Sequence, residues 1–272
     1  MKIIINKSLD SMPEGTYPIS CPGDFYHHLY ASVHGVIETP PVADWLRRVH
    51  DLEGPCLLVS PISWQASHRD AMIVAYGESL GLSAADADAW FEVFLEFVSF
   101  FQMKAVKQDD THWLLQCAGR PQVITKPVHQ LLQQPLMSII RTMDDTLFWP
   151  RFITEAQMFF SSHPVNHARG GLSPINGIWL WGGGQRAASV KKPLVCSSDA
   201  LLQLASHLST AVERFDPSKR YPKSSILCFD ELIENEDFML NTKNADWIWN
   251  NVAYTSLNPH RWWSWVLENI KS

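Results

Sequence analysis

Residues 155–184 constrain the fold more than any other part of this chain. They read, in order, as the end of a helix, a polar turn, a short apolar strand at residues 178–181 and a run of three glycines. The helix is expected to end at His163, because a residue that precedes a proline is disfavoured in the helical region. A helix that turns directly into a buried strand is typical of layered proteins that contain both elements.

The polar residues of this segment have the chemistry of an anion site. An arginine offers a planar fork to a carboxylate or phosphate, and glycine N–H groups allow close approach of the backbone to an anion. We therefore predict a ligand site formed by His163, Asn166, Arg169, Asn176, Gly182 and Gly183. The alternative is that the polar side chains only brace a long connection between helix and strand.

Strands and helices are mixed along the rest of the chain. Apolar runs predict strands at residues 2–6, 55–61, 71–75, 103–106, 113–117, 178–181, 191–196 and 225–229. Helical spacing predicts helices at residues 25–36, 42–49, 83–101, 147–160 and 199–215, and a helical tail over 244–270. The order predicts the α/β class, with a mixed sheet flanked by helices. We expect a single domain over residues 1–272, with only a soft boundary near 185–191 and a helical, Trp-rich C-terminal part over about 199–272.

Composition excludes several classes of partner. The net charge is -6 and the sequence pI is about 6.0, and the sequence has no run of Lys and Arg, which argues against nucleic acid. No apolar stretch is long enough to cross a membrane, and the first ten residues lack the apolar core of a signal peptide. The five cysteines are scattered and contain no CxxC pair, so we expect reduced thiols in a cytoplasmic protein.

Tryptophan is abundant, with twelve residues. Some cluster near the end of the chain, at Trp247, Trp249, Trp262, Trp263 and Trp265. We interpret them as packing in the core or at a homodimer interface, and the alternative is a platform that stacks on sugars or bases.

The segment after Glu155 also resembles a known family. Its pattern E-A-Q, then H-P-V-N, an arginine, a P-x-N and an apolar strand with a Gly-rich end is similar to that of cofactor-independent phosphoglycerate mutases of the archaeal type. It resembles more closely the bacterial proteins labelled phosphoglycerate mutase-like or RpfE-type regulatory proteins. The resemblance covers about residues 55–186, with weaker support from PCLLVSPISWQASHRDAMIVAYG and GLSAADADAWF. It implies a reduced form of the alkaline-phosphatase-like fold.

The resemblance also implies what the chain lacks. The mutases hold two divalent metals with Asp and His clusters and phosphorylate a serine. Here the first strand is followed by Asn6 and only later by Asp10, and no histidine follows Asp230 until His260. We therefore predict no cofactor and no metal. The residues left as ligands for an active enzyme are Asp10, Asp24, His27, His28 and Asp230.

Three functions remain open on the sequence. The first is a non-catalytic or regulatory member of the phosphoglycerate mutase-like family that binds a small phosphorylated or carboxylated metabolite. The second is an active mutase that uses metal-dependent phosphoryl transfer. The third is a structural or interaction protein that dimerises through its aromatic tail.

Overall fold

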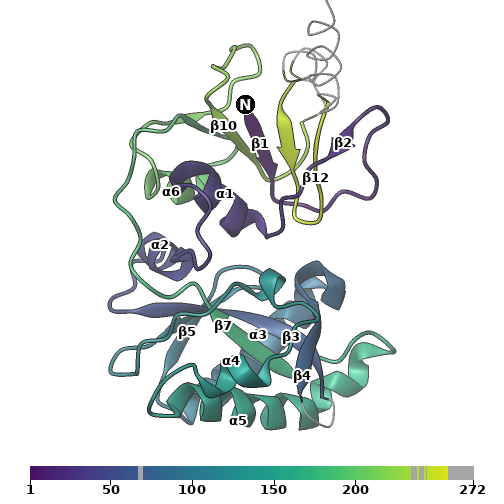
Figure 1. The fold of residues 1–272 in the computed structure, drawn as a ribbon, viewed down its shortest axis with the longest axis vertical. Coiled ribbons are helices and arrows are strands. Elements are labelled where there is room, and N and C mark those ends of the chain that lie inside the picture. Colours follow the sequence, from purple (N-terminus) through teal and green to yellow (C-terminus); the bar gives the residue numbers. More distant parts are fainter. Residues whose placement is uncertain (67–69, 234–237, 239–241, 243, 257–272) are drawn as a thin grey trace, which may run out of the picture. The chain divides into compact units, whose positions relative to one another are not determined.

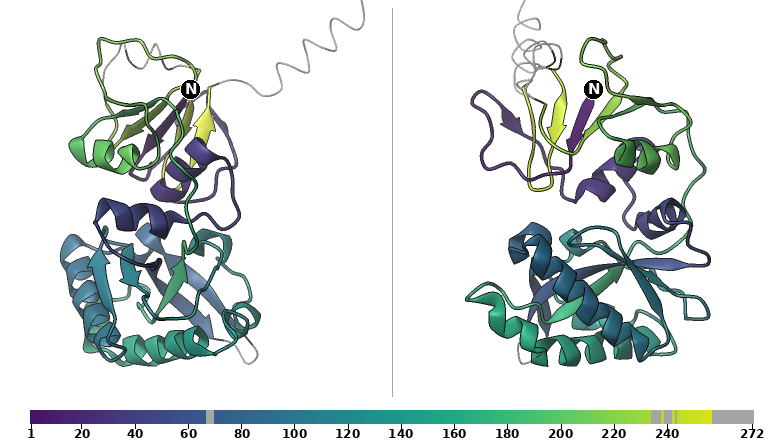
Figure 2. Two further views of the ribbon diagram at one scale, coloured as in Figure 1. Left: turned by 90° about the vertical axis from the view of Figure 1, so that its left-hand side faces the viewer. Right: turned by 180° about the vertical axis from the view of Figure 1, so that it is seen from behind.

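The chain forms two compact units in the computed structural model, which describes residues 1–66, 70–233, 238, 242 and 244–256. Unit 1 consists of Met1–Val36 and Ala188–Ser272, and unit 2 consists of Ile37–Ala187. Each unit combines a sheet with helices, so the predicted α/β class is confirmed (Figures 1 and 2). The chain passes from unit 2 back to unit 1 between residues 187 and 188, inside the soft boundary expected near 185–191. That the whole chain folds as a single domain stays a prediction.

Unit 1 is built on a seven-stranded sheet with the order β2-β12-β11-β1-β10-β8-β9 (Figure 1). Its strands are β1 (Lys2–Ile5), β2 (Tyr17–Pro18), β8 (Leu194–Cys196), β9 (Val212–Arg214), β10 (Ile226–Phe229), β11 (Asp246–Ile248) and β12 (Ala253–Thr255). β1 pairs in parallel with both β10 and β11, while β12 and β2 are antiparallel to their neighbours. Ile3, Ile4 and Ile5 have no exposed surface, as expected for a parallel strand that is covered on both faces.

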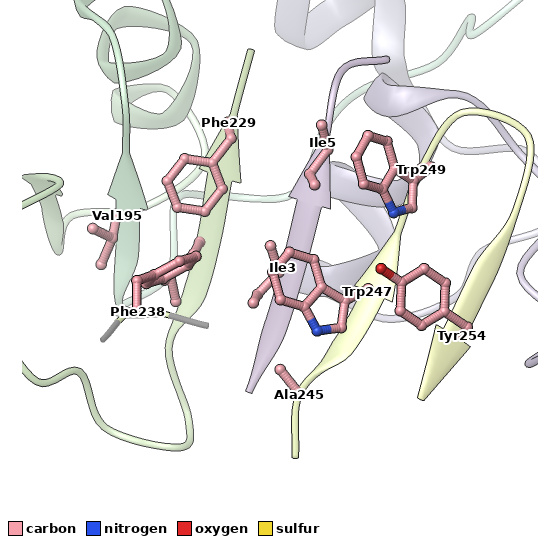
Figure 3. Packing of buried hydrophobic residues seen from close by; sticks show 10 residues of the cluster. Ile3, Ile5, Val195, Phe229, Phe238, Ala245, Trp247, Trp249 and Tyr254 are labelled. Carbon is pink, nitrogen blue, oxygen red and sulfur yellow. The ribbon is translucent and has the colours of Figure 1, made fainter. Parts of the chain in front are cut away.

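Aromatic residues fill one face of this sheet (Figure 3). The rings of Trp247 and Tyr254 stack with centroids 6.3 Å apart, and those of Phe229 and Phe238 meet edge to face at 5.5 Å. Trp247 and Trp249 are buried, so the core interpretation of these two residues is confirmed. Trp262, Trp263 and Trp265 lie outside the described residues.

The helix predicted over residues 244–270 is wrong in its described part. Residues 246–255 form the antiparallel pair β11 and β12, in which Trp247 lies opposite Tyr254. The asparagines between the two strands make the turn, and Asn251 accepts a hydrogen bond from Leu9 N and donates one to Leu9 O, both at 2.9 Å. Residues 246–255 form strands because β11 pairs with β1 and because this turn joins β11 to β12. The aromatic residues alone do not distinguish these strands from a helix.

The predicted helix over residues 199–215 is shorter than expected. The helix α6 (Asp199–Ser206) ends at the C-cap residue His207. The chain then forms β9, which pairs in parallel with β8 through Leu194 and Val212. Hydrogen bonding to the sheet edge replaces the last turns of the predicted helix.

Unit 2 is built on a five-stranded sheet. Its strands are β3 (Cys56–Ala66), β4 (Ala71–Tyr76), β5 (Lys104–Lys107), β6 (Trp113–Gln116) and β7 (Gly177–Trp181). β3 is the hub, because it pairs in antiparallel fashion with β4, β6 and β7. β5 and β6, which correspond to the strands predicted at residues 103–106 and 113–117, pair as an antiparallel hairpin.

The helices of the two units follow the predicted order. They are α1 (Phe25–His34) in unit 1, α2 (Val42–Val49), α3 (Ala84–Ser99), α4 (Met137–Arg141) and α5 (Phe148–Ser162) in unit 2, and the short 3-10 helices η1 (Gly77–Leu80), η2 (Val128–Gln130) and η3 (Pro164–Arg169). Ser83 is the N-cap of α3 and forms a capping box with Asp86. α3 packs on α5, where Trp90 stacks on Phe160 with ring centroids 5.5 Å apart. None of the described helices has the length and apolarity needed to cross a bilayer.

Burial of His28 in α1 gives a pH-dependent stability. The side chain is 2% exposed, and burial lowers its pKa from 6.5 to about 4. The unfolded chain therefore binds more protons than the folded chain between these pH values. We expect this residue to remove about 2–3 kcal/mol from the free energy of unfolding as the pH falls from 6.5 to 4.

Urea titrations of the His28→Gln variant across this pH range test the expectation. The variant should show a flatter pH dependence than the parent chain, and substitution of the exposed His167 with Gln should leave the dependence unchanged. An equally steep loss of stability in His28→Gln contradicts the assignment.

Candidate functional site

Asn166 closes the turn that follows α5. Its side-chain Nδ2 donates to Phe160 O at 2.8 Å and to Ile175 O at 2.9 Å. Its Oδ1 accepts from Ile175 N at 2.9 Å. The carboxamide thus takes the place of a peptide group and holds the two ends of the turn together.

Asn176 fastens the same turn to the sheet. Its Oδ1 accepts from Trp64 N at 2.8 Å, and its Nδ2 donates to Trp64 O at 2.9 Å. Its backbone N donates to Ile62 O at 3.2 Å. These bonds join the residue before β7 to the far half of β3.

Arg169 is buried beside this turn, with 6% of its surface exposed. Its Nε donates to Ser173 O at 2.8 Å and its Nη2 donates to Leu80 O, while Nη1 has no hydrogen-bond partner in the described structure. Burial lowers the pKa of the guanidinium, and the charge of Asp86 opposes this shift.

His163 completes the set of polar residues in the turn. Its Nδ1 accepts from Val165 N at 3.4 Å, and its ring lies 6.2 Å from that of Trp90. The four polar side chains therefore all contact neighbouring parts of the chain. The bracing alternative accounts for these contacts, and a ligand-binding role for the four residues stays a prediction.

Loss of Arg169 tests the bracing role directly. Arg169→Ala leaves two main-chain carbonyl groups without their donor, and we expect it to lower the free energy of unfolding by about 2–4 kcal/mol. Thermal unfolding of the unliganded protein measures this, with the exposed Arg151→Ala as the matched control. A melting temperature equal to that of the parent chain contradicts the bracing role.

Of the residues considered as metal ligands, Asp24, His27 and His28 lie at the start of α1. Asp24 caps α1 by accepting from His27 N at 2.8 Å, and Asp10 is exposed. Asp230 follows β10 and accepts from Ser197 Oγ at 3.3 Å. Among the residues that the structure describes, no three His, Cys, Asp or Glu side chains form a group that suits a metal ion.

A cavity of about 530 Å³ lies at the opposite end of β7, within unit 2. It is lined by Asp44, Arg47 and Arg48 of α2, residues 54–57 at the start of β3, Cys117 and residues 120–123 after β6, and residues 183–186 after β7. Gly183 is the predicted site residue that contributes to this lining; Gly182 precedes it, and His163, Asn166, Arg169 and Asn176 do not contribute.

Four arginines line the cavity among the residues that the structure describes. They are Arg47, Arg48, Arg120 and Arg186, and none of them belongs to the site predicted from the sequence. Residues 37–187 contain eight arginines and fifteen carboxylates, of which four arginines and one carboxylate line the cavity. Half of the arginines of an acidic unit therefore face one small volume.

The one lining carboxylate, that of Asp44, joins two of these segments. Its Oδ1 accepts from Arg47 Nε at 2.7 Å, and its Oδ2 accepts from the backbone N of Arg186 at 3.1 Å. Arg48 Nε lies 3.8 Å from the same carboxylate, and the Arg48 side chain is 43% exposed. Arg120 is held from the other side, where Nη2 donates to Phe101 O at 2.5 Å and the guanidinium lies 4.9 Å from the centre of the Phe148 ring.

Two cysteines complete the wall without adding charge. Burial raises the pKa of the Cys56 thiol to about 11, although the nearby Arg47 opposes this shift. Burial also raises the pKa of Cys117. Both thiols are therefore neutral at physiological pH.

The glycines after β7 allow the cavity to form. Gly182 adopts φ +73° and its carbonyl accepts from Ala43 N at 3.0 Å. A Cβ on Gly183 would lie 2.5 Å from Val123 O and 2.9 Å from Leu57 Cδ2, which no real side chain tolerates. Only glycine permits this approach of β7 to the segment after β6.

Comparison with known proteins adds little. No protein-family model matches the chain, and a search of curated proteins gives no significant match. One solved structure is similar, the cofactor-independent phosphoglycerate mutase from Thermoplasma acidophilum, at 13% identity over 93% of this chain and 89% of that chain. The TM-score is 0.32, which is too low to carry an argument about residue roles.

A side chain at position 183 should disturb the cavity. We expect Gly183→Ala to cost about 2–4 kcal/mol of unfolding free energy, because the clash is with a main-chain carbonyl that cannot rotate away. The comparison is Gly119→Ala, which carries the backbone strain of φ +74°, about 1–2 kcal/mol, but whose Cβ would meet nothing within 4 Å. Urea titration of both variants measures the difference, and equal costs contradict the close approach.

Proposed function

We propose that unit 2 binds a small organic anion, phosphorylated or carboxylated, in the arginine-lined cavity after β7. The observation that carries the proposal is that, among the described residues, four arginines and one acidic residue line a cavity of about 530 Å³. Arginine donates paired N–H groups to carboxylate and phosphate oxygens, and it keeps its charge at any physiological pH.

The size and walls of the cavity favour an anion that carries an organic body. Pockets for small molecules typically enclose about 300–1,000 Å³, which is far more than a bare phosphate needs. Leu57, Pro121 and Val123 add apolar residues to the same lining. A ligand with one charged end and a compact carbon skeleton fits this lining.

The proposed ligand class is the one that the sequence resemblance implied. The proposed site is the cavity after β7 instead of the polar turn before β7. The resemblance pointed to anion recognition without a two-metal cage, as in a non-catalytic or regulatory protein. Arg169 makes backbone hydrogen bonds instead, and of the predicted residues Gly183 belongs to the proposed site. A binding or regulatory role for the whole chain is therefore the function we propose.

Arg48 gives the cleanest test, because its side chain is half exposed and makes only a 3.8 Å ion pair. We expect inorganic phosphate, and more strongly some members of a panel of phosphorylated and carboxylated metabolites, to raise the melting temperature of the protein. Arg48→Gln should weaken binding by about fivefold or more in isothermal titration, through loss of a charge-assisted hydrogen bond.

The control for this experiment is Arg151→Gln. Arg151 is an exposed arginine of the same unit that pairs with Glu155 and does not line the cavity. Arg151→Gln removes the same charge as Arg48→Gln. Because Arg151 does not line the cavity, the variant should bind the same anions as the parent chain. Equal weakening by both substitutions, or no binding to the parent chain, rules the proposal out.

A further inference from the structure

Among the described residues, Asp44 is the acidic residue that lines the cavity, and its charge opposes an anionic ligand. It lies in the first turn of α2 and is 8% exposed. A carboxylate in such a place costs free energy unless its oxygens are paired. Its position therefore needs an explanation beyond surface solubility.

The hydrogen bonds of Asp44 link two segments that carry the arginines. Oδ1 accepts from Arg47 Nε at 2.7 Å and Oδ2 accepts from Arg186 N at 3.1 Å. The preceding residue strengthens the same link, because Ala43 N donates to Gly182 O at 3.0 Å. The start of α2 and the chain leaving β7 are thus fastened at two adjacent points.

This fastening acts on the groups that would meet an anion. Arg47 Nη1 also donates to Leu52 O at 3.2 Å, so its guanidinium is fixed at two nitrogens before any ligand arrives. A long arginine side chain loses rotamer freedom when it binds, and a side chain that is already fixed loses less. The backbone of Arg186 is held in the same way.

On this basis, and resting on the function proposed above, we propose that Asp44 is a positioning residue for the anion site. Its carboxylate holds Arg47 and the Arg186 segment in the binding arrangement, and this outweighs the repulsion between its own charge and the ligand. The proposal predicts the direction in which anion affinity changes when the Asp44 charge is removed. Repulsion alone requires that removing the Asp44 charge tightens anion binding, whereas positioning requires that it weakens binding.

The matched control is Asp51, which follows α2 and is exposed. Asp51→Asn removes one negative charge near the same arginines, but Asp51 does not line the cavity. Asp44→Asn removes the same charge and keeps one side-chain oxygen as an acceptor. Asp44→Ala removes the charge and both acceptors.

The experiment measures the dissociation constant for inorganic phosphate by isothermal titration, at a temperature where melting curves show every variant to be folded. We expect affinity to fall in the order parent, Asp44→Asn, Asp44→Ala, with about a tenfold loss in Asp44→Ala. Asp51→Asn should bind as tightly as the parent or slightly more tightly. The Arg47 Nε–H proton should exchange faster in both Asp44 variants, and this nuclear magnetic resonance signal does not report on stability.

Two outcomes overturn the inference, and they differ. If the Asp44 variants bind phosphate as tightly as Asp51→Asn or more tightly, while Arg48→Gln still weakens binding, the carboxylate only repels anions and the proposed function survives. If the parent chain binds no phosphate and no member of the metabolite panel, the proposed function fails and the role of Asp44 fails with it. If Asp44→Ala does not fold, the comparison of Asp44→Asn with Asp51→Asn decides.

Discussion

The cavity of unit 2 depends on the close approach of the chain leaving β7 to two other backbones. Gly182 accepts a hydrogen bond from Ala43 at the start of α2, and Gly183 lies against the carbonyl group of Val123. These two contacts bring together α2, the segment after β6 and the segment after β7. Each of the three carries arginine, so the charge of the cavity follows from the packing of main chain on main chain.

The polar residues that the sequence predicts as a site lie in the turn before β7, and the cavity is lined by residues after β7. Asn166, Arg169 and Asn176 have the side chains of an anion site, but the same groups pair equally well with peptide N–H and C=O groups. Residue type alone does not distinguish these two partners. No local sequence pattern marks Arg47 and Arg186 as neighbours. They are far apart in the sequence, and the fold brings both to the carboxylate of Asp44.

Elements with local determinants were predictable. The three isoleucines of β1 and the Ser83–Asp86 capping box are encoded within a few residues, and both lie where the sequence indicates. The hairpin of β11 and β12 was not predictable in this way. Its conformation depends on pairing with β1 and on the contact of Asn251 with Leu9, which connect opposite ends of the chain.

The sheet of unit 1 has a further consequence for synthesis on the ribosome. β1 precedes unit 2 in the chain, whereas its partner strands, residues 226–229 and 246–248, follow unit 2, so the whole of unit 2 is translated between them. Throughout that interval a strand of three isoleucines has neither of its native neighbours, and unpaired apolar edges are prone to misassociation. Unit 2, by contrast, is one continuous stretch whose strands all emerge together. The nascent chain therefore has to shield β1 until β10 and β11 have been synthesised.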